Sequence, residues 1–81
     1  MLNVDDMPAL PELKPGIYRH FKGNEYRLLC VARHSETCEP MVVYQALYGA
    51  GGVWVRPAHM WCETIERDGY VGPRFTLVKE D

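Results

Sequence analysis

The sequence lacks any long apolar run. None of its 81 residues belong to a stretch of about 18 consecutive apolar residues, which is the length that a membrane helix needs. The first residues also lack the succession of basic, apolar and small residues that marks a secretory signal. We therefore expect a cytoplasmic protein that does not act on a membrane.

An excess of basic residues is also missing. Lys and Arg number 9 against 11 Asp and Glu, which gives a formal net charge of -2. Proteins that bind duplex nucleic acid through its phosphates usually carry a basic balance. The charge therefore argues against a duplex DNA partner, although a local basic patch is compatible with it.

Cysteine is scarce, and its spacing excludes a disulfide framework. The three cysteines, Cys30, Cys38 and Cys62, are odd in number and form no Cys-x-x-Cys pair, which favours reduced thiols. The pairs His34-x-x-x-Cys38 and His59-x-x-Cys62 resemble zinc ligands in residue type only loosely. We expect neither a metal nor a cofactor, with Cys62 packed inside and Cys38 exposed in a loop.

What is present suits one small domain. The apolar fraction is 47% and the charged fraction 25%, both typical of a globular chain. Residues 1–14 contain Pro8 and Pro11, which prevent a regular helix or a central strand. We expect an extended arm over residues 1–14, fastened by Leu10 and Leu13, and a single β-barrel-like domain over residues 15–81.

The domain reads as a series of short strands separated by turns. Strands are predicted at residues 17–21, 26–34, 41–48, 53–56, 62–67 and 74–78, with one helical turn at residues 57–61. The segment 41–48 is rich in β-branched and aromatic residues and is expected to be the central strand. The prediction is a mainly β fold of five to six strands, arranged as a strongly bent antiparallel sheet or an SH3-like partly open barrel.

The strand at residues 26–34 gives a specific expectation about faces. Strict alternation places Tyr26, Leu28 and Cys30 on one face, with Ala32 and His34 continuing it. Arg27, Leu29, Val31 and Arg33 then share the other face.

Aromatic and basic residues on neighbouring strands suggest a binding surface. Tyr44 and Tyr48 share one face of their strand, and Trp54 and Arg56 share one face of the next. Aromatic rings beside guanidinium groups suit a nucleobase, a cation or a proline-rich peptide. The candidate ligand-binding residues are Arg33, His34, Tyr44, Tyr48, Trp54 and Arg56. A core role for the same aromatic residues, Trp54 among them, remains the alternative.

The run Arg33-His34-Ser35-Glu36 contains the residue types of a hydrolase triad. Neighbours along a strand point to opposite faces, so adjacent residues do not assemble a triad. A hairpin loop is the simpler interpretation. An enzyme with His20 or His34 as general base is a third hypothesis, and no catalytic residue is assigned.

The order of the motifs resembles a known family. The motifs, with x for any residue, are PGIYRHFKGNxY at 15–26, VARHSET at 31–37, VVYxALY at 42–48, WVRPxxM at 54–60 and PRF at 73–75. Together they are similar to the small bacterial family called domain of unknown function 1653, over about residues 15–78. The resemblance implies a compact, mostly β, cytoplasmic bacterial domain and supplies no reaction. His20, Ser35, Pro57 and Arg74 fall within the motifs, whereas Cys38, His59 and Cys62 fall outside the recognised positions.

Two functions follow as expectations. The first is a non-enzymatic binding module whose aromatic and arginine patch takes a small anionic or nucleotide-like ligand, or a single-stranded RNA segment. The alternative is a protein-interaction or accessory module that docks on a larger partner through the arm or a sheet edge.

Overall fold

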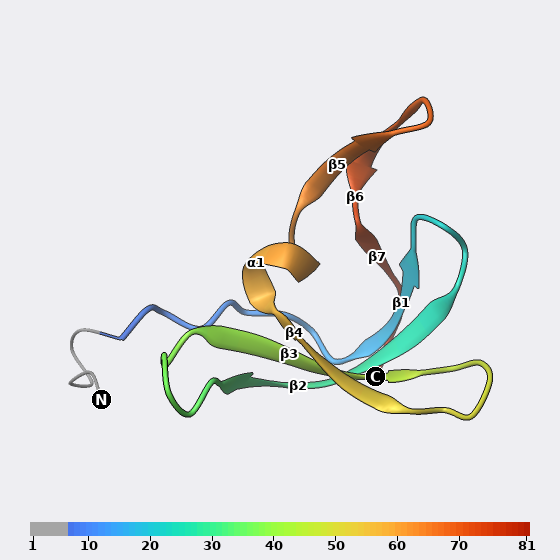
Figure 1. The fold of residues 1–81 in the computed structure, drawn as a ribbon. Coiled ribbons are helices and arrows are strands. Elements are labelled where there is room, and N and C mark those ends of the chain that lie inside the picture. The colour runs from blue at the N-terminus through green and yellow to red at the C-terminus, as the bar shows by residue number, and fades with distance from the viewer. Residues whose placement is uncertain (1–6) are drawn as a thin grey trace.

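The computed structural model describes residues 7–81, and within this range the chain is mainly β (Figure 1). Seven strands and one helical turn follow one another along the described chain: β1 Gly16–His20, β2 Glu25–Arg33, β3 Pro40–Ala46, β4 Val53–Pro57, α1 Ala58–Trp61, β5 Thr64–Arg67, β6 Tyr70–Pro73 and β7 Phe75–Glu80. The mainly β class, the antiparallel pairing and the single helical turn are confirmed. The strand count exceeds five or six because β6 was not predicted: the Asp68-Gly69 turn leads into this strand before β7 begins.

Five strands form one bent antiparallel sheet in the order β4-β3-β2-β1-β7, and β5 and β6 form a second, two-stranded sheet. Among the described residues β4 and β7 are the two edges of the larger sheet and do not pair, so the sheet forms no closed barrel. Figure 1 shows the β5–β6 hairpin rising away from this sheet beyond α1. The strand expected to be central, β3, is an interior strand, but β2 occupies the middle position.

The expected alternation along β2 is wrong beyond Leu28. Leu28 pairs with Tyr44, but the next pair joins Cys30 to Val43, so a bulge at Leu29 shifts the register. Leu28 is 1% exposed, whereas Cys30 lies on the opposite face and is exposed. Strict period-two reading of a sequence cannot anticipate the extra residue of a bulge.

One face of the sheet, called the inner face here, carries the core. Its buried side chains are Tyr18, Leu28, Val42, Tyr44 and Phe75. The helical turn α1 closes this core because Trp61, 2% exposed, stacks on Phe75 with ring centroids 3.7 Å apart and planes at 7°. The other side of the sheet, called the outer face, carries Cys30, Val43 and Val55, which are cross-strand neighbours.

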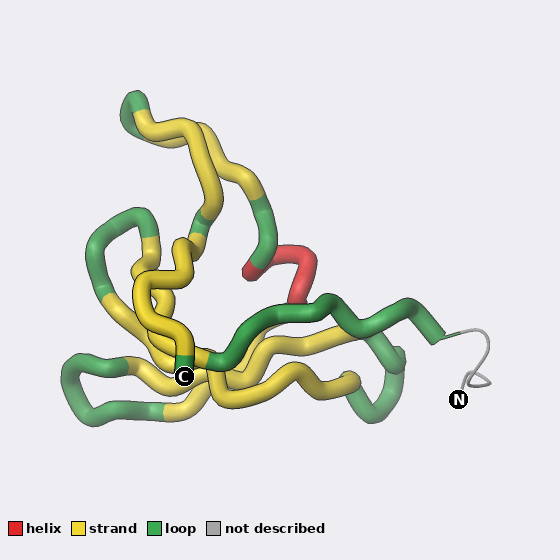
Figure 2. Tube along the Cα trace, turned by 180° about the vertical axis from the view of Figure 1, so that it is seen from behind, coloured by secondary structure: helices red, strands yellow, loops and turns green. Residues whose placement is uncertain are grey.

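The described part of the arm, residues 7–14, forms neither helix nor strand. Leu13 packs against the core, whereas Leu10 is 43% exposed, so only one of the two expected anchors is seated. The chain's last residue returns to the end of the arm, where the Asp81 amide donates to the Pro15 carbonyl over 3.1 Å (Figure 2). Residues 1–6 of the expected arm lie outside the described residues, and the domain division at residue 15 stays a prediction.

Within residues 7–81 no helix has the length and apolar character required to span a bilayer.

Candidate functional site

The six predicted ligand-binding residues divide into two groups. Arg33 and His34 lie at the end of β2 and organise the loop that leads to β3. Arg33 Nη1 donates to the carbonyl oxygens of Pro8 over 2.8 Å and of Cys38 over 3.0 Å. His34 Nδ1 accepts hydrogen bonds from two backbone amides of its own loop, at 3.1 and 3.3 Å. These contacts give both side chains a part in holding the loop and the arm.

The remaining four predicted residues lie on or beside the inner face, at different depths. Tyr44 is 7% exposed and contacts the rings of Tyr26 and Trp61, so it supports the surface from below and does not present its ring. Tyr48 is 48% exposed, and its hydroxyl lies 2.8 Å from that of Tyr26. Trp54 is 61% exposed, which makes the alternative of a core tryptophan wrong for this position.

Arg56 is the cation that the edge strand β4 contributes to this face. Its register partner on β3 is the fully buried Val42, so the side chain starts above the core. The guanidinium carbon lies 5.6 Å from the ring centroid of Phe75, a cation–π arrangement across the bend of the sheet. Against residues 7–81 this guanidinium forms no ion pair or hydrogen bond. Its donors are therefore available to a ligand.

His20, expected from the sequence only as a candidate general base, lies next to the ring of Phe75. Its imidazole is 5.0 Å from Phe75 and 4.5 Å from Phe21 between ring centroids. Nδ1 accepts the backbone N–H of Lys22 over 3.1 Å, which leaves Nε2 as the protonated nitrogen of the neutral ring. Burial, followed by the positive charges of Arg74 and Arg56, lowers the pKa of His20.

Arg74 adds a further cation from the junction of β6 and β7. Its Nη2 donates to Glu63 over 3.2 Å, and its side chain is only 11% exposed. The Nε atom is buried and has no hydrogen-bond partner among the described residues. Lys22 and Arg67 also act on His20 electrostatically. We call Lys22, Arg56, Arg67 and Arg74 the cationic cluster around His20; within this chain of net charge -2 it forms a local basic region.

The lowered pKa of His20 makes a prediction about pH. The unfolded chain binds this proton more readily than the folded protein, so protonation favours unfolding. The contribution of neutral His20 to stability is present above pH of about 6.5 and is lost as the pH falls from there through the lowered folded-state pKa. Urea denaturation at about pH 8 and about pH 5 should show a smaller loss of stability for His20→Gln than for the wild type. Equal losses in the two proteins would contradict the stated environment of His20.

A hydrolase site is not assembled around Ser35. Its hydroxyl donates to the carboxylate of Glu36, while His34 Nδ1 serves the loop amides. Serine and histidine therefore do not form a nucleophile–base pair.

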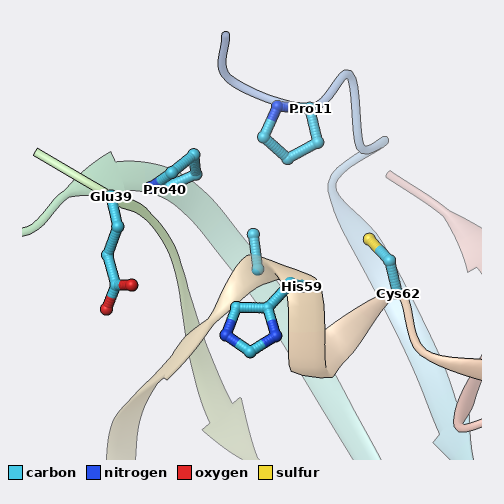
Figure 3. A pocket seen from close by; sticks show the side chains of 6 residues that line it. Pro11, Glu39, Pro40, His59 and Cys62 are labelled. Atoms are coloured by element: carbon cyan, nitrogen blue, oxygen red, sulfur yellow. The ribbon is translucent and has the colours of Figure 1, made fainter. Parts of the chain in front are cut away.

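A separate groove lies between the arm and α1, with a volume of about 280 Å³ (Figure 3). Pro11 stands on the side of the arm, and His59 and Cys62 stand on the helical side. The lining is almost entirely apolar, and burial raises the pKa of the Cys62 thiol, which keeps it protonated. Glu39 also lines the groove, but Figure 3 shows its carboxylate pointing away from Pro11, so the groove offers mainly apolar space.

The residues of the zinc alternative are not brought together. Across residues 7–81 no group of three or more His, Cys, Asp and Glu side chains could hold a metal ion. The expected locations of two thiols are also reversed, because Cys38 is 4% exposed and Cys62 is exposed. Cys38 adopts a positive φ of 62° in the loop that Arg33 fastens, and this turn directs its side chain inward.

Comparison with known proteins assigns the chain to a family. A family model described as Protein of unknown function (DUF1653) matches residues 16–77. A comparison with curated proteins found no match. The structure is similar to the crystal structure of a DUF1653 protein from Bordetella bronchiseptica: the two are 39% identical, the alignment covers 90% of this chain and 96% of that one, and the TM-score is 0.80. The resemblance seen in the motifs is thereby confirmed, and the chain belongs to the DUF1653 family.

Proposed function

We propose that this protein is a non-enzymatic binding module whose inner face takes a nucleotide-like anion, either a free mononucleotide or a nucleotide of single-stranded RNA. The observation that carries the proposal is Arg56. Its guanidinium is unpaired within residues 7–81, sits over the ring of Phe75, and lies two residues from the exposed Trp54 on the same strand face.

The electrostatic surroundings support an anion at this place. The positive charges of Arg74, Arg56 and Lys22 all act on His20. The His20 ring in turn lies next to Phe75, so this part of the surface favours an anion. A phosphate accepts hydrogen bonds from guanidinium groups in a bidentate geometry, and an anion next to His20 raises the pKa of its imidazole. Binding of a phosphate should therefore strengthen as the pH falls through the titration of His20.

Aromatic side chains support a base beside the phosphate. Trp54 and Tyr48 present exposed rings, and stacking of a base on an aromatic ring contributes about 1–3 kcal/mol. The supporting layer is rigid, because Tyr44 and Tyr26 are in edge contact beneath and beside these rings. The three free thiols fit a reducing compartment, and we place the protein in the cytoplasm.

Tryptophan fluorescence tests the proposal because the two tryptophans differ in exposure. Trp61 is buried, so a nucleotide that stacks on the surface quenches Trp54 alone. Adenosine monophosphate and a short oligouridylate should quench saturably, adenosine less so, and Trp54→Phe should abolish the response. Quenching that is linear in nucleotide, or that persists in Trp54→Phe, would refute stacking at this face.

A second candidate function, docking on another protein through a sheet edge, is favoured by the exposure of Val53, Trp54 and Val55 on the edge strand β4. The arm is a weaker docking element, because Arg33 holds Pro8 and Leu13 is packed against the core.

A further inference from the structure

The edge strand β4 is protected only at its end, by Arg56 and Pro57, and its first three residues are exposed and apolar. Val53, Trp54 and Val55 are 57%, 61% and 61% exposed, and Arg56 is the strand's one charged residue. The opposite edge, β7, ends in Lys79 and Glu80, and its pairing with β1 is interrupted by a register shift. Charges, prolines and irregular pairing hinder association at an edge, and over Val53, Trp54 and Val55 the strand β4 has none of them.

The register shows which backbone groups of β4 are free. The Ala46 amide donates to the Gly52 carbonyl over 2.9 Å, and this pair continues the register in which Gln45 faces Val53. Hydrogen-bonded and non-bonded pairs alternate in an antiparallel ladder. Trp54 and Arg56 therefore direct their N–H and C=O groups toward β3. Val53 and Val55 direct theirs toward the open edge, and the strand ends at Pro57, which has no N–H and whose carbonyl belongs to the first turn of α1.

From this pattern we infer that β4 pairs with β4 of a second copy of this chain, antiparallel and with the two-fold axis at Val55. This interface goes beyond the proposed ligand binding. The two Val55 residues exchange both N–H···O=C bonds. Val53 of each copy lies opposite Pro57 of the other, whose carbonyl begins α1, so the backbone bonds between the copies are those of the Val55 pair.

The side chains match in this register as well. On the outer face Val55 meets Val55, and Val53 meets Pro57, so every directly opposed pair is apolar. On the inner face Trp54 of each copy lies opposite Arg56 of the other, at the short separation of a non-hydrogen-bonded pair. Trp is the best ring for a cation–π contact, and Arg56 already has Phe75 on its own side. A shift of the register by two residues would place Arg56 opposite Arg56 or Trp54 opposite Trp54, and both lose this match.

The length of the strand sets the strength of the dimer. Five residues span only about 17 Å. An interface confined to this strand therefore buries less than the roughly 800 Å² per partner of a standard stable interface. We therefore expect a dissociation constant in the micromolar range. Gly51 and Gly52 would come to lie next to α1 of the other copy, where a side chain would be an obstacle.

Sedimentation equilibrium from about 10 µM to about 1 mM protein tests the interface without any ligand. The wild type should pass from monomer toward dimer. Val55→Lys should raise the dissociation constant at least tenfold, because the two introduced ammonium groups would oppose each other. The matched control is Val71→Lys on β6, which is 68% exposed and should dimerise like the wild type. A wild type that stays monomeric, or a dimer that Val55→Lys leaves unchanged, overturns the inference.

Cysteine cross-linking tests the register independently of the change in charge. In a background with the exposed Cys30 and Cys62 replaced by Ser, Val55→Cys should oxidise readily to a disulfide-linked dimer, because the paired Cα atoms would be about 5.5 Å apart. Val53→Cys should not, since its two copies would be separated by four residues along the strand. Equal cross-linking at both positions would overturn the proposed register. Mononucleotide binding by a monomeric Val55→Lys protein would leave the proposed function intact whatever the result here.

Discussion

Replacement of Trp61 by Ala is expected to remove most of the stability of the fold. Trp61 is 2% exposed, stacks on Phe75 at 3.7 Å and contacts the rings of Tyr18 and Tyr44 at 5.3 and 5.1 Å between centroids. Truncation of a buried tryptophan costs about 3–5 kcal/mol, and a chain of this length has a total stability of only about 4–12 kcal/mol. The expected loss is large because the Trp61 side chain, which comes from α1, fills the space inside the bend of the sheet.

Urea and thermal denaturation followed by circular dichroism would measure the effect. The control is Trp54→Ala, which deletes the same side chain at a position 61% exposed and should change the free energy of unfolding by well under half as much. Equal destabilisation by the two substitutions would mean that Trp54 is a core residue and that the division between core and binding surface is wrong.

Replacement of Arg56 by Gln is expected to weaken binding of a mononucleotide at least tenfold while the protein stays folded. A hydrogen bond to a charged group is worth about 1.5–3 kcal/mol, and a bidentate contact to phosphate places two such bonds on one side chain. Arg56 has no ion pair with residues 7–81 that the substitution would break. The cation–π contact with Phe75 is lost, which costs about 0.5–1 kcal/mol.

The matched control is Arg19→Gln, which makes the same charge change at a residue that is paired with Glu25 over 2.8 Å. Dissociation constants from the fluorescence titration, measured beside a denaturation curve for each variant, separate affinity from stability. Equal weakening by both substitutions would show that net charge, and not the Arg56 site, governs binding. A greatly destabilised Arg56→Gln protein would assign Arg56 to the fold.

Six of the seven strands were predictable from their residue types, whereas β6 was not predicted. The β-branched and aromatic run of β3, and the Gly-rich turn before β4, define their strands by local chemistry alone. The bulge at Leu29 was not predictable, since it arises where β2 must bend against β3 and no residue there marks it. For the same reason the face assigned to Cys30 was wrong.

The candidate site was predictable only in part. Trp54 and Arg56 lie two residues apart on one strand, so the period of two is enough to place them on the same face. His20 and Arg74 lie on β1 and just before β7, and they approach Arg56 only because the sheet bends until its two edge strands face each other across Phe75. Arg33 and His34 were grouped with this patch because of their residue types. Their hydrogen bonds to Pro8, Cys38 and the loop amides, which hold them elsewhere, cannot be read from the sequence.

The measurement that tests the central claim most directly is an amide NMR titration of the isotopically labelled protein with adenosine monophosphate at modest salt. The account predicts saturable shifts grouped on Trp54, Arg56, Phe75 and His20, with the His20 ring signal moving to a higher pKa in the complex. Unchanged spectra up to millimolar nucleotide, or shifts grouped on the groove between the arm and α1, would contradict an anion site on the inner face.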